Sequence, residues 1–459
     1  MRIVRRMLSK EVLEMANSLV GRTVGLTART KTARMAAGIA VLSLVTAACA
    51  AESDGTTDGA KGGPETTAVA DNPAAVTDLV KYTGGSEGAA DDSLAPVTVG
   101  WVNQQGGALG FPSATDGAEA AVEYINKNLG GIDGHPLKLK TCYVVENEQD
   151  GNACGLKLVN DKTVKTVLFG STITGNQSFL AVNKGQKPVL MANSISSTDA
   201  QADNVFIYNG NPSSIFRGLA TYLGTVVKAK KVSVIYPQDA QSADGAKVLE
   251  QALGDLDIDV KAVGFDPSTT NLTSAAVASG AADADAVIPL VSSPPACVAA
   301  AKALDTLKVK APVVSAGAFC FSAPVAKGLG GEAPQWQQIS TQTNVADKTQ
   351  PDVQAYIEAS SKAGLSDQSQ STPDAALAWG LVLTAARLTN AAGGADATAQ
   401  TIAEQAKSFI GPLLLGSETI SCGSDSAAPG ICGAQTRVFE YTGNGSYKAL
   451  TDWLEPSAK

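Results

Sequence analysis

Short apolar runs along the chain alternate with segments in which apolar residues recur every three or four positions. Residues 96–102, PVTVGWV, are strand-like, and a glycine-rich loop separates them from a helix-like segment at 118–129. A Gly-Gly pair ends that helix, and residues 137–145 alternate as a second strand. Further strand-like runs follow, TVLFG, PVLMAN and VFIYN. Repeated strand and helix with short loops predict a doubly wound parallel sheet.

The same rhythm restarts in the second half of the chain. A helix-like segment at 213–227 precedes the strand-like run VSVIYP, and helices and strands alternate as far as residues 311–317, APVVSAG. We therefore predict an α/β fold with two doubly wound lobes of similar construction. Open parallel sheets bind ligands beyond the carboxyl ends of their strands. Function is expected in the loops that follow the strands.

The first 49 residues are predicted to be an export signal. Basic residues precede an apolar run at 35–45, and small residues then lead to Cys49. The run is shorter than the roughly 20 residues that span a bilayer, which argues against a membrane helix. The Ala-Ala-Cys ending resembles a lipobox, so we expect lipid attachment at Cys49. Simple secretion is the alternative, because Thr46 stands where Leu is usual. Residues 50–93 begin with a Gly-, Ser-, Thr- and Ala-rich stretch and are predicted to be a flexible tether.

Composition excludes several kinds of partner. The chain has 459 residues, of which 44% are apolar and 17% charged, so most of it is expected to be globular. Its formal net charge of −9 and its pI near 4.9 argue against a surface that neutralises nucleic-acid phosphates or lies on anionic lipid. We expect no nucleic-acid partner.

The cysteines other than Cys49 fall into sequence-local pairs. In an oxidising extracytoplasmic space, the simplest of the possible connectivities joins the two members of each pair. Zinc binding is the rival interpretation, but the chain has no C-x-x-C sequence, and its single histidine, His135, lies in a Gly-His-Pro turn. We predict no metal site and three disulfides: Cys142–Cys154, Cys297–Cys320 and Cys422–Cys432.

Residues 116–139, DGAEAAVEYINKNLGGIDGHPLKL, closely resemble an element of the leucine/isoleucine/valine-binding family, the type I periplasmic binding proteins of branched-chain amino acid ABC importers. Residues 158–175 and 187–196 resemble that family's next strand and loop units, and order and spacing agree over most of the chain. The resemblance implies two lobes that are joined by crossing strands and close over one ligand. It places 94–213 and 323–433 in an N-terminal lobe, and 214–322 and 434–459 in a C-terminal lobe.

In the family that this chain resembles, hydroxyls and backbone N–H groups at two loops of the first lobe hold a ligand carboxylate. The matching loops here follow TVLFG and PVLM, and an oxyanion gains from such donors at helix starts. Plain helix capping is the alternative role. The glycine-rich loop after the first strand is expected to line the same cleft. The predicted first-lobe ligand residues are Gln104, Gln105, Ser171, Thr172, Ala192, Asn193 and Ser194.

The second lobe departs from the family. The resemblance implies a Tyr after this lobe's first strand and an acidic residue after the SAG segment, where it pairs with a ligand ammonium, but residues 316–320 contain no carboxylate. Burying an ammonium without a charged partner costs several kcal/mol, so carboxylate, amide or partly apolar ligands fit better than α-amino acids. Asp239 is a candidate substitute, with a solvated turn as its alternative role. Ser292, Ser293 and Phe319 are the other predicted ligand residues.

These patterns predict a binding protein and not an enzyme. The sequence contains no G-x-S-x-G, P-loop or H-E-x-x-H motif. We expect an extracytoplasmic receptor, on the outer face of the cell membrane or in the periplasm, that delivers a small molecule to ABC permease subunits. That molecule is expected to be amino-acid-like, a carboxylate or an amide. The alternative is a ligand-sensing regulatory lipoprotein of the same fold. The protein is expected to act as a monomer without a cofactor.

Overall fold

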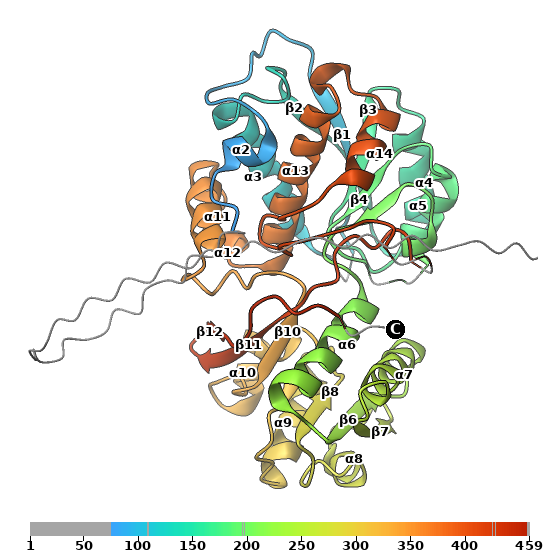
Figure 1. The fold of residues 1–459 in the computed structure, drawn as a ribbon, viewed down its shortest axis with the longest axis vertical. Coiled ribbons are helices and arrows are strands. Elements are labelled where there is room, and N and C mark those ends of the chain that lie inside the picture. Colours follow the sequence, from blue (N-terminus) through green and yellow to red (C-terminus); the bar gives the residue numbers. More distant parts are fainter. Residues whose placement is uncertain are drawn as a thin grey trace, which may run out of the picture. The chain divides into compact units, whose positions relative to one another are not determined.

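The computed structural model describes residues 75–107, 110–194, 196, 198–424, 426 and 428–456. The predicted export signal, Cys49 and most of the predicted tether lie outside these residues. The described residues belong to one compact unit, Thr67–Lys459, and none of their helices is long and apolar enough to cross a membrane. They form two α/β lobes, called the first and the second lobe below (Figure 1).

The first lobe is built on a five-stranded sheet in which every neighbouring pair of strands is parallel. Both faces of the sheet are covered by helices, so its strands are apolar along most of their length. In spatial order the strands are β2 (Leu137–Val144), β1 (Val97–Gln104), β3 (Val164–Phe169), β4 (Val189–Met191) and β5 (Val205–Ile207).

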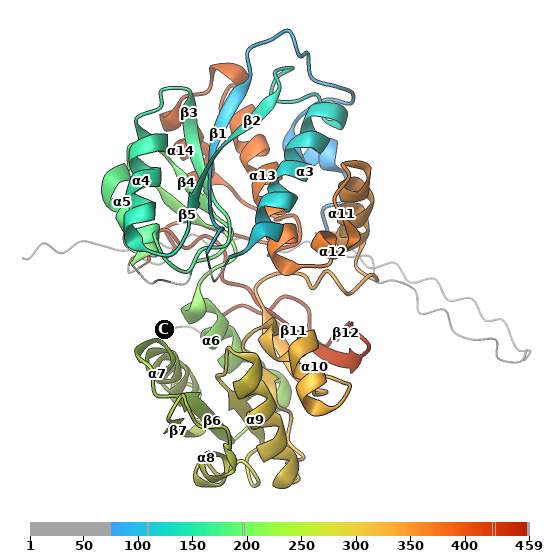
Figure 2. The same ribbon diagram turned by 180° about the vertical axis from the view of Figure 1, so that it is seen from behind.

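Two pairs of helices lie on opposite faces of this sheet (Figure 2). Trp101 packs with α3 (Pro112–Asn128) and α13 (Pro373–Ala391), whereas Val102 packs with α4 (Glu148–Val159) and α5 (Asn176–Asn183). Adjacent strand residues enter separate cores because strand side chains alternate between faces. The lobe also contains η2 (Asp199–Gln201), α11 (Pro351–Lys362), α12 (Asp367–Gln370), η5 (Gly394–Asp396) and α14 (Ala399–Ser408).

Helix α13 approaches α3 closely at Gly117. A Cβ atom at this position would lie 2.2 Å from the carbonyl oxygen of Ala375, so the contact requires glycine. Helix α13 begins at Thr372, whose hydroxyl accepts the Ala375 N–H at 3.3 Å, and Pro373 occupies its first turn. Trp379 of the same helix is completely buried. This packing sets a helix from late in the sequence against α3 and Trp101 of β1.

The end of the predicted tether is folded. Helix α2 (Leu79–Thr83) begins at Asp78, whose side chain accepts a backbone N–H of the first turn. Tyr82 is buried, and its hydroxyl oxygen lies 2.8 Å from that of Thr384 on α13. The prediction of a flexible tether was therefore wrong for residues 75–93. The error has a physical cause: the apolar residues of this short segment are buried by α13, which no local pattern reveals.

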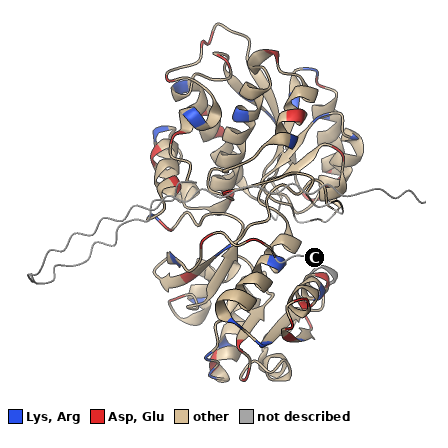
Figure 3. Ribbon diagram, in the orientation of Figure 1, with Lys and Arg blue, Asp and Glu red and all other residues tan. Residues whose placement is uncertain are grey.

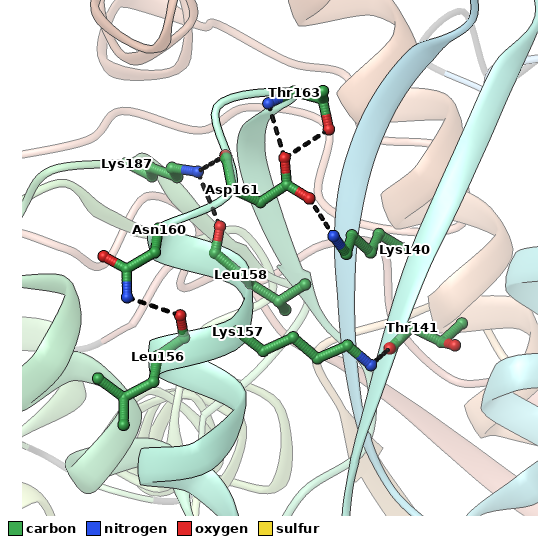
Figure 4. A network of polar contacts seen from close by, with 9 residues as sticks. All are labelled: Lys140, Thr141, Leu156, Lys157, Leu158, Asn160, Asp161, Thr163 and Lys187. Carbon is green, nitrogen blue, oxygen red and sulfur yellow. Dashed lines mark hydrogen bonds and ion pairs between the residues drawn. The ribbon is translucent and has the colours of Figure 1, made fainter.

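A polar network lies at the amino ends of β3 and β4 (Figure 4). The buried Lys187 donates from Nζ to the carbonyl oxygens of Leu158 at 2.7 Å and Asp161 at 2.5 Å. Burial lowers the pKa of Lys187. The Asp161 carboxylate forms an ion pair with Lys140, and that hydrogen bond holds the pKa of Asp161 below its usual range. The network stabilises the sheet edge that lies away from the strands' carboxyl ends.

The second lobe contains seven strands in two groups. The parallel group β7-β6-β8 and the group β12-β11-β10-β9 are joined by a parallel bridge between Val287 and Val313. Strand β10 is parallel to β9, but β11 is antiparallel to both β10 and β12, so the parallel pattern ends in an antiparallel hairpin. The strands are β6 (Lys231–Pro237), β7 (Asp259–Phe265), β8 (Ala286–Pro289), β9 (Val314–Ser315), β10 (Gln337–Ser340), β11 (Arg437–Gly443) and β12 (Ser446–Ala449).

Residues 323–340 belong to the second lobe, and their predicted assignment to the N-terminal lobe was wrong. β10 pairs with β9 and β11, and Ile339 packs with Val314 and Val438 in this lobe's core. The other predicted lobe bounds stay predictions. The helices of this lobe are α6 (Pro212–Thr221), the π-helix η3 (Tyr222–Val227), α7 (Ala240–Gly254), α8 (Thr273–Ala278), α9 (Pro294–Thr306), η4 (Ala318–Phe321) and α10 (Ala323–Leu329).

The chain passes between the lobes in three segments. Residues 208–211 lead from β5 to α6, residues 341–350 from β10 to α11, and residues 433–436 into β11. The first and third begin side by side: the Cys432 N–H donates to the carbonyl oxygen of Ile207 at 2.9 Å just before them, and a Cβ atom at Gly433 would lie 2.0 Å from the carbonyl oxygen of Tyr208. The structure pairs the cysteines as predicted, in the disulfides Cys142–Cys154, Cys297–Cys320 and Cys422–Cys432.

Candidate ligand-binding site

The predicted first-lobe residues lie at the carboxyl ends of three neighbouring strands. β1 ends at Gln104, β3 leads through Gly170 to Ser171 and Thr172, and β4 leads into residues 192–194. The Gln104 N–H donates to the Ser171 carbonyl at 3.1 Å, which joins the ends of β1 and β3. The parallel sheet therefore gathers residues that are widely separated in the sequence.

Both predicted glutamines are engaged within the protein. Gln104 is buried, and its side-chain oxygen accepts the N–H of Ile173 at 2.9 Å. The side-chain oxygen of Gln105 accepts the Thr115 hydroxyl at 2.8 Å. These bonds hold the glycine-rich loop and the loop after β3 in place. Contact between either glutamine and a ligand stays a prediction.

Ser171 contacts a carboxylate that sequence reasoning missed. Its hydroxyl donates to Oδ1 of Asp374, which lies in the first turn of α13. Burial raises the pKa of the Asp374 carboxyl, and the Ser171 hydrogen bond acts in the opposite direction. The only local signal was a Thr-Pro-Asp sequence at a helix start, which reads as ordinary capping.

A chain of hydrogen bonds links the other two predicted hydroxyls. Thr172 Oγ1 donates to Oδ1 of Asn176 at 2.6 Å, and Asn176 Nδ2 donates to Oδ2 of Asp199 at 3.1 Å. The same carboxylate oxygen accepts Ser194 Oγ at 2.7 Å. The loops after β3 and β4 are thus tied together through Asn176 and Asp199, and the sequence analysis predicted neither of them.

Asp199 is an incompletely paired buried carboxylate. It is completely buried, and its Oδ1 has no hydrogen-bond partner among the described residues. Desolvation raises the pKa of Asp199, the Ser194 and Asn176 hydrogen bonds oppose that rise, and nearby Glu148 adds to it. Such groups are costly to keep and concentrate at functional sites.

Ala192 and Asn193 differ in their surroundings. Asn193 is exposed, whereas Ala192 is buried and lines a pocket with Tyr208 and Asn209 beside α13. The Tyr208 hydroxyl and the Asn209 side-chain oxygen have no hydrogen-bond partner within the described part of the chain. A ligand role for Ala192 and Asn193 stays a prediction.

The predicted second-lobe residues also follow strand ends. Asp239 follows β6, and its carboxylate accepts the Ser242 N–H at 2.8 Å and the Ser242 hydroxyl at 2.9 Å, so its observed contacts are those of a helix cap. Ser292 and Ser293 follow β8 and are exposed, and the Ser293 side chain makes no capping hydrogen bond at the start of α9. Phe319, in η4 after β9, is 57% exposed.

Charged side chains and potential metal ligands do not gather at one place in the described part of the chain. Acidic and basic residues are scattered over both lobes (Figure 3). Within the described ranges, no three His, Cys, Asp or Glu side chains gather so that they could hold a metal ion. His135 Nδ1 lies 2.7 Å from the carbonyl oxygen of Ala95, which precedes β1.

The sequence matches the model of a family described as periplasmic binding protein over residues 96–419. The chain belongs to the periplasmic binding protein family. It is therefore a solute-binding protein of the transporter type and not an enzyme, and its family is extracytoplasmic. No curated protein matches the sequence significantly.

Solved structures of other binding proteins share this fold. A leucine binding protein from Thermotoga maritima is 14% identical, with a TM-score of 0.59 over 78% of this chain and 99% of that chain. A branched-chain amino acid transporter substrate binding protein from Streptococcus pneumoniae, in complex with isoleucine, is 17% identical, with a TM-score of 0.60 over 79% and 100%. An ABC transporter solute binding protein from R. palustris, in complex with 4-hydroxybenzoate, is 15% identical, with a TM-score of 0.58 over 79% and 97%. The fold is thus the type I periplasmic binding fold that the resemblance implied.

Proposed function

We propose that this binding protein captures a small molecule between its two lobes and delivers it to an ABC importer. The observation that carries the proposal is the family match over residues 96–419, together with polar loops that follow the carboxyl ends of strands in both lobes. We expect an amino-acid-like molecule, a carboxylate or an amide. Isoleucine and 4-hydroxybenzoate, the ligands of two similar binding proteins, are both small carboxylates.

The protein captures its ligand because the ligand makes more contacts in one arrangement of the lobes than in the others. A ligand that touches both lobes in one arrangement and a single lobe in others shifts the population toward the first arrangement. Permease subunits that recognise that arrangement then take up only loaded protein. We further propose that Cys49 carries a lipid anchor and that the protein acts as a monomer on the outer face of the cell membrane or in the periplasm.

The binding step is tested by thermal unfolding of the full chain, with its disulfides formed, against amino acids, amides, carboxylates, sugars and aromatic acids. A ligand at about 100 times its dissociation constant stabilises the native state by about 2.7 kcal/mol. We expect one or more members of the first three classes to raise the melting temperature. The absence of any shift across all classes would contradict a binding function.

Delivery is tested separately, by uptake of the radiolabelled ligand into cells with and without the protein. If the protein is a component of an importer, uptake falls in cells that lack the protein and recovers when the gene is restored. Binding without any effect on uptake would instead favour a sensing role for the same fold.

A further inference from the structure

A segment near the C-terminus runs back along the third crossing segment. The Leu454 N–H donates to the Thr436 carbonyl oxygen at 2.7 Å, and the Thr436 N–H donates to the Leu454 carbonyl oxygen at 3.0 Å. The Leu450 N–H donates to the Val438 carbonyl oxygen at 2.8 Å. Residues 450–455, called the C-terminal strap below, therefore pair with the chain where it enters the second lobe.

The strap is fixed to the second lobe. Leu450 and Leu454 pack against that lobe's core, which includes Val438. The Thr451 hydroxyl oxygen accepts the Val438 N–H at 3.1 Å. Burial of apolar side chains and backbone pairing both hold the strap in place, so we treat the strap as a part of the second lobe.

Gln435 joins the strap to the first lobe. This side chain is buried in the third crossing segment, and its Nε2 donates to Oε1 of Glu455 on the strap at 2.6 Å. Its Oε1 accepts the backbone N–H of Thr419 at 3.3 Å. Thr419 directly precedes Ile420, which belongs to the core of the first lobe. One amide side chain therefore contacts both lobes.

Arg437 makes a second connection of the same kind. It is buried at the start of β11, where its Nε donates to the carbonyl oxygen of Thr451 on the strap at 3.3 Å. Its Nη1 donates to Oε1 of Gln350 at 3.3 Å. Gln350 caps α11, whose Val353 lies in the core of the first lobe. The guanidinium group also lies 5.6 Å from the ring centroid of Trp453, again on the strap.

These contacts oppose movement of the lobes. The lobes change their arrangement by rotation of the backbone in the crossing segments, and Gln435 and Arg437 lie in or next to the third of these. A hydrogen bond is lost once its donor and acceptor separate beyond about 3.5 Å. Rotation at the crossing segments separates the strap from Thr419 and Gln350, so it breaks or weakens the bonds that pass through Gln435 and Arg437.

We infer that the C-terminal strap restrains movement of the two lobes about the crossing segments, with Gln435 and Arg437 as the positioning residues. The inference goes beyond the proposed function, because it concerns the lobes of the ligand-free protein. It assigns control of the lobe arrangement to side chains at the crossing segments and to residues that end the described chain. Its test uses no ligand, so failure of the proposed function and failure of this inference are distinguishable.

Single-molecule fluorescence transfer between the lobes tests the inference on the full, disulfide-bonded chain. The dyes are attached through a ketone-bearing amino acid that replaces Lys162 in the first lobe and Lys247 in the second, both of which are exposed. Gln435→Met keeps the length of the side chain and removes both of its hydrogen bonds. Because one hydrogen bond of ordinary net strength changes a two-state ratio roughly two- to tenfold, we expect the population outside the main transfer peak to rise by about that factor.

Gln337→Met is the matched control, because the Gln337 side chain accepts the Tyr222 hydroxyl at 2.8 Å within the second lobe. A purely structural role predicts a lower melting temperature for both variants and an unchanged transfer distribution. Glu455→Ala, at an exposed position, serves if Gln435→Met does not fold. An unchanged distribution in folded Gln435→Met or Glu455→Ala protein, or an equal change in the control, would overturn the inference.

Discussion

The contact between α3 and α13 makes Gly117→Ala the most informative stability test. The added Cβ would lie 2.2 Å from the carbonyl oxygen of Ala375, and 2.7 and 2.8 Å from its Cα and carbonyl carbon. All three are backbone atoms, so no side-chain rotation relieves the contact and the two helices must separate. Because Ala375 directly follows Asp374, the same separation moves the carboxylate away from Ser171.

The expected loss in the free energy of unfolding of Gly117→Ala is the difference between two opposing effects. Overpacking a core costs about 1–3 kcal/mol, and a clash with rigid backbone belongs at the upper end. Alanine recovers about 1 kcal/mol of helix propensity over glycine. The net loss is about 2 kcal/mol, which lowers the melting temperature of a lobe of this size by about 4–8 °C.

Thermal unfolding followed by circular dichroism measures this loss. Gly254→Ala is the matched control, because Gly254 ends α7 and a Cβ atom there would meet nothing within 4 Å. We expect the control to melt at or slightly above the temperature of the unsubstituted protein. The packing argument is refuted if Gly117→Ala melts no lower than the unsubstituted protein, or if the control loses as much.

Three further outcomes are expected. Lys187→Met leaves two carbonyl oxygens unpaired and should lower the free energy of unfolding in urea by about 1–3 kcal/mol. Lys140→Met removes only an ion pair near the surface and should lower it by at most about 1 kcal/mol. Equal losses in the two variants would contradict the argument that the burial of Lys187 makes its hydrogen bonds important. The Asp199 carboxyl binds its proton more tightly in the folded state, because burial raises its pKa from 3.8. Stability therefore falls as pH rises through the raised pKa, and this fall should be absent from the melting temperatures of Asp199→Asn. Replacing both Cys297 and Cys320 by serine removes a disulfide with a sequence separation of 23. The free energy of unfolding in urea should fall by about 3 kcal/mol. An unchanged midpoint of unfolding would argue against that pairing.

The alternation of strands and helices could be predicted because the spacing of apolar residues within each short segment indicates it. Strands of the first sheet, such as β1 and β3, are short apolar runs, and α3 carries its apolar residues at helical spacing. The disulfides were predictable for a similar reason, since each joins cysteines that are close in sequence. Strand β10 was misplaced because its partners, β9 and β11, lie on either side of it in the sheet but far apart along the chain.

Asp374 shows why the local sequence pattern does not reveal the contacts of a side chain that tertiary packing positions. Helices α11 and α13 both begin with Pro-Asp, so this shared dipeptide does not indicate where either carboxylate lies. One accepts the Thr343 hydroxyl, whereas the other accepts the Ser171 hydroxyl beside the candidate site. Next to Asp374, helix α13 approaches α3 closely at Gly117, a contact between residues that lie far apart along the chain. The sequence therefore predicts a helix start, but only the packed fold determines which carboxylate lies beside the candidate site.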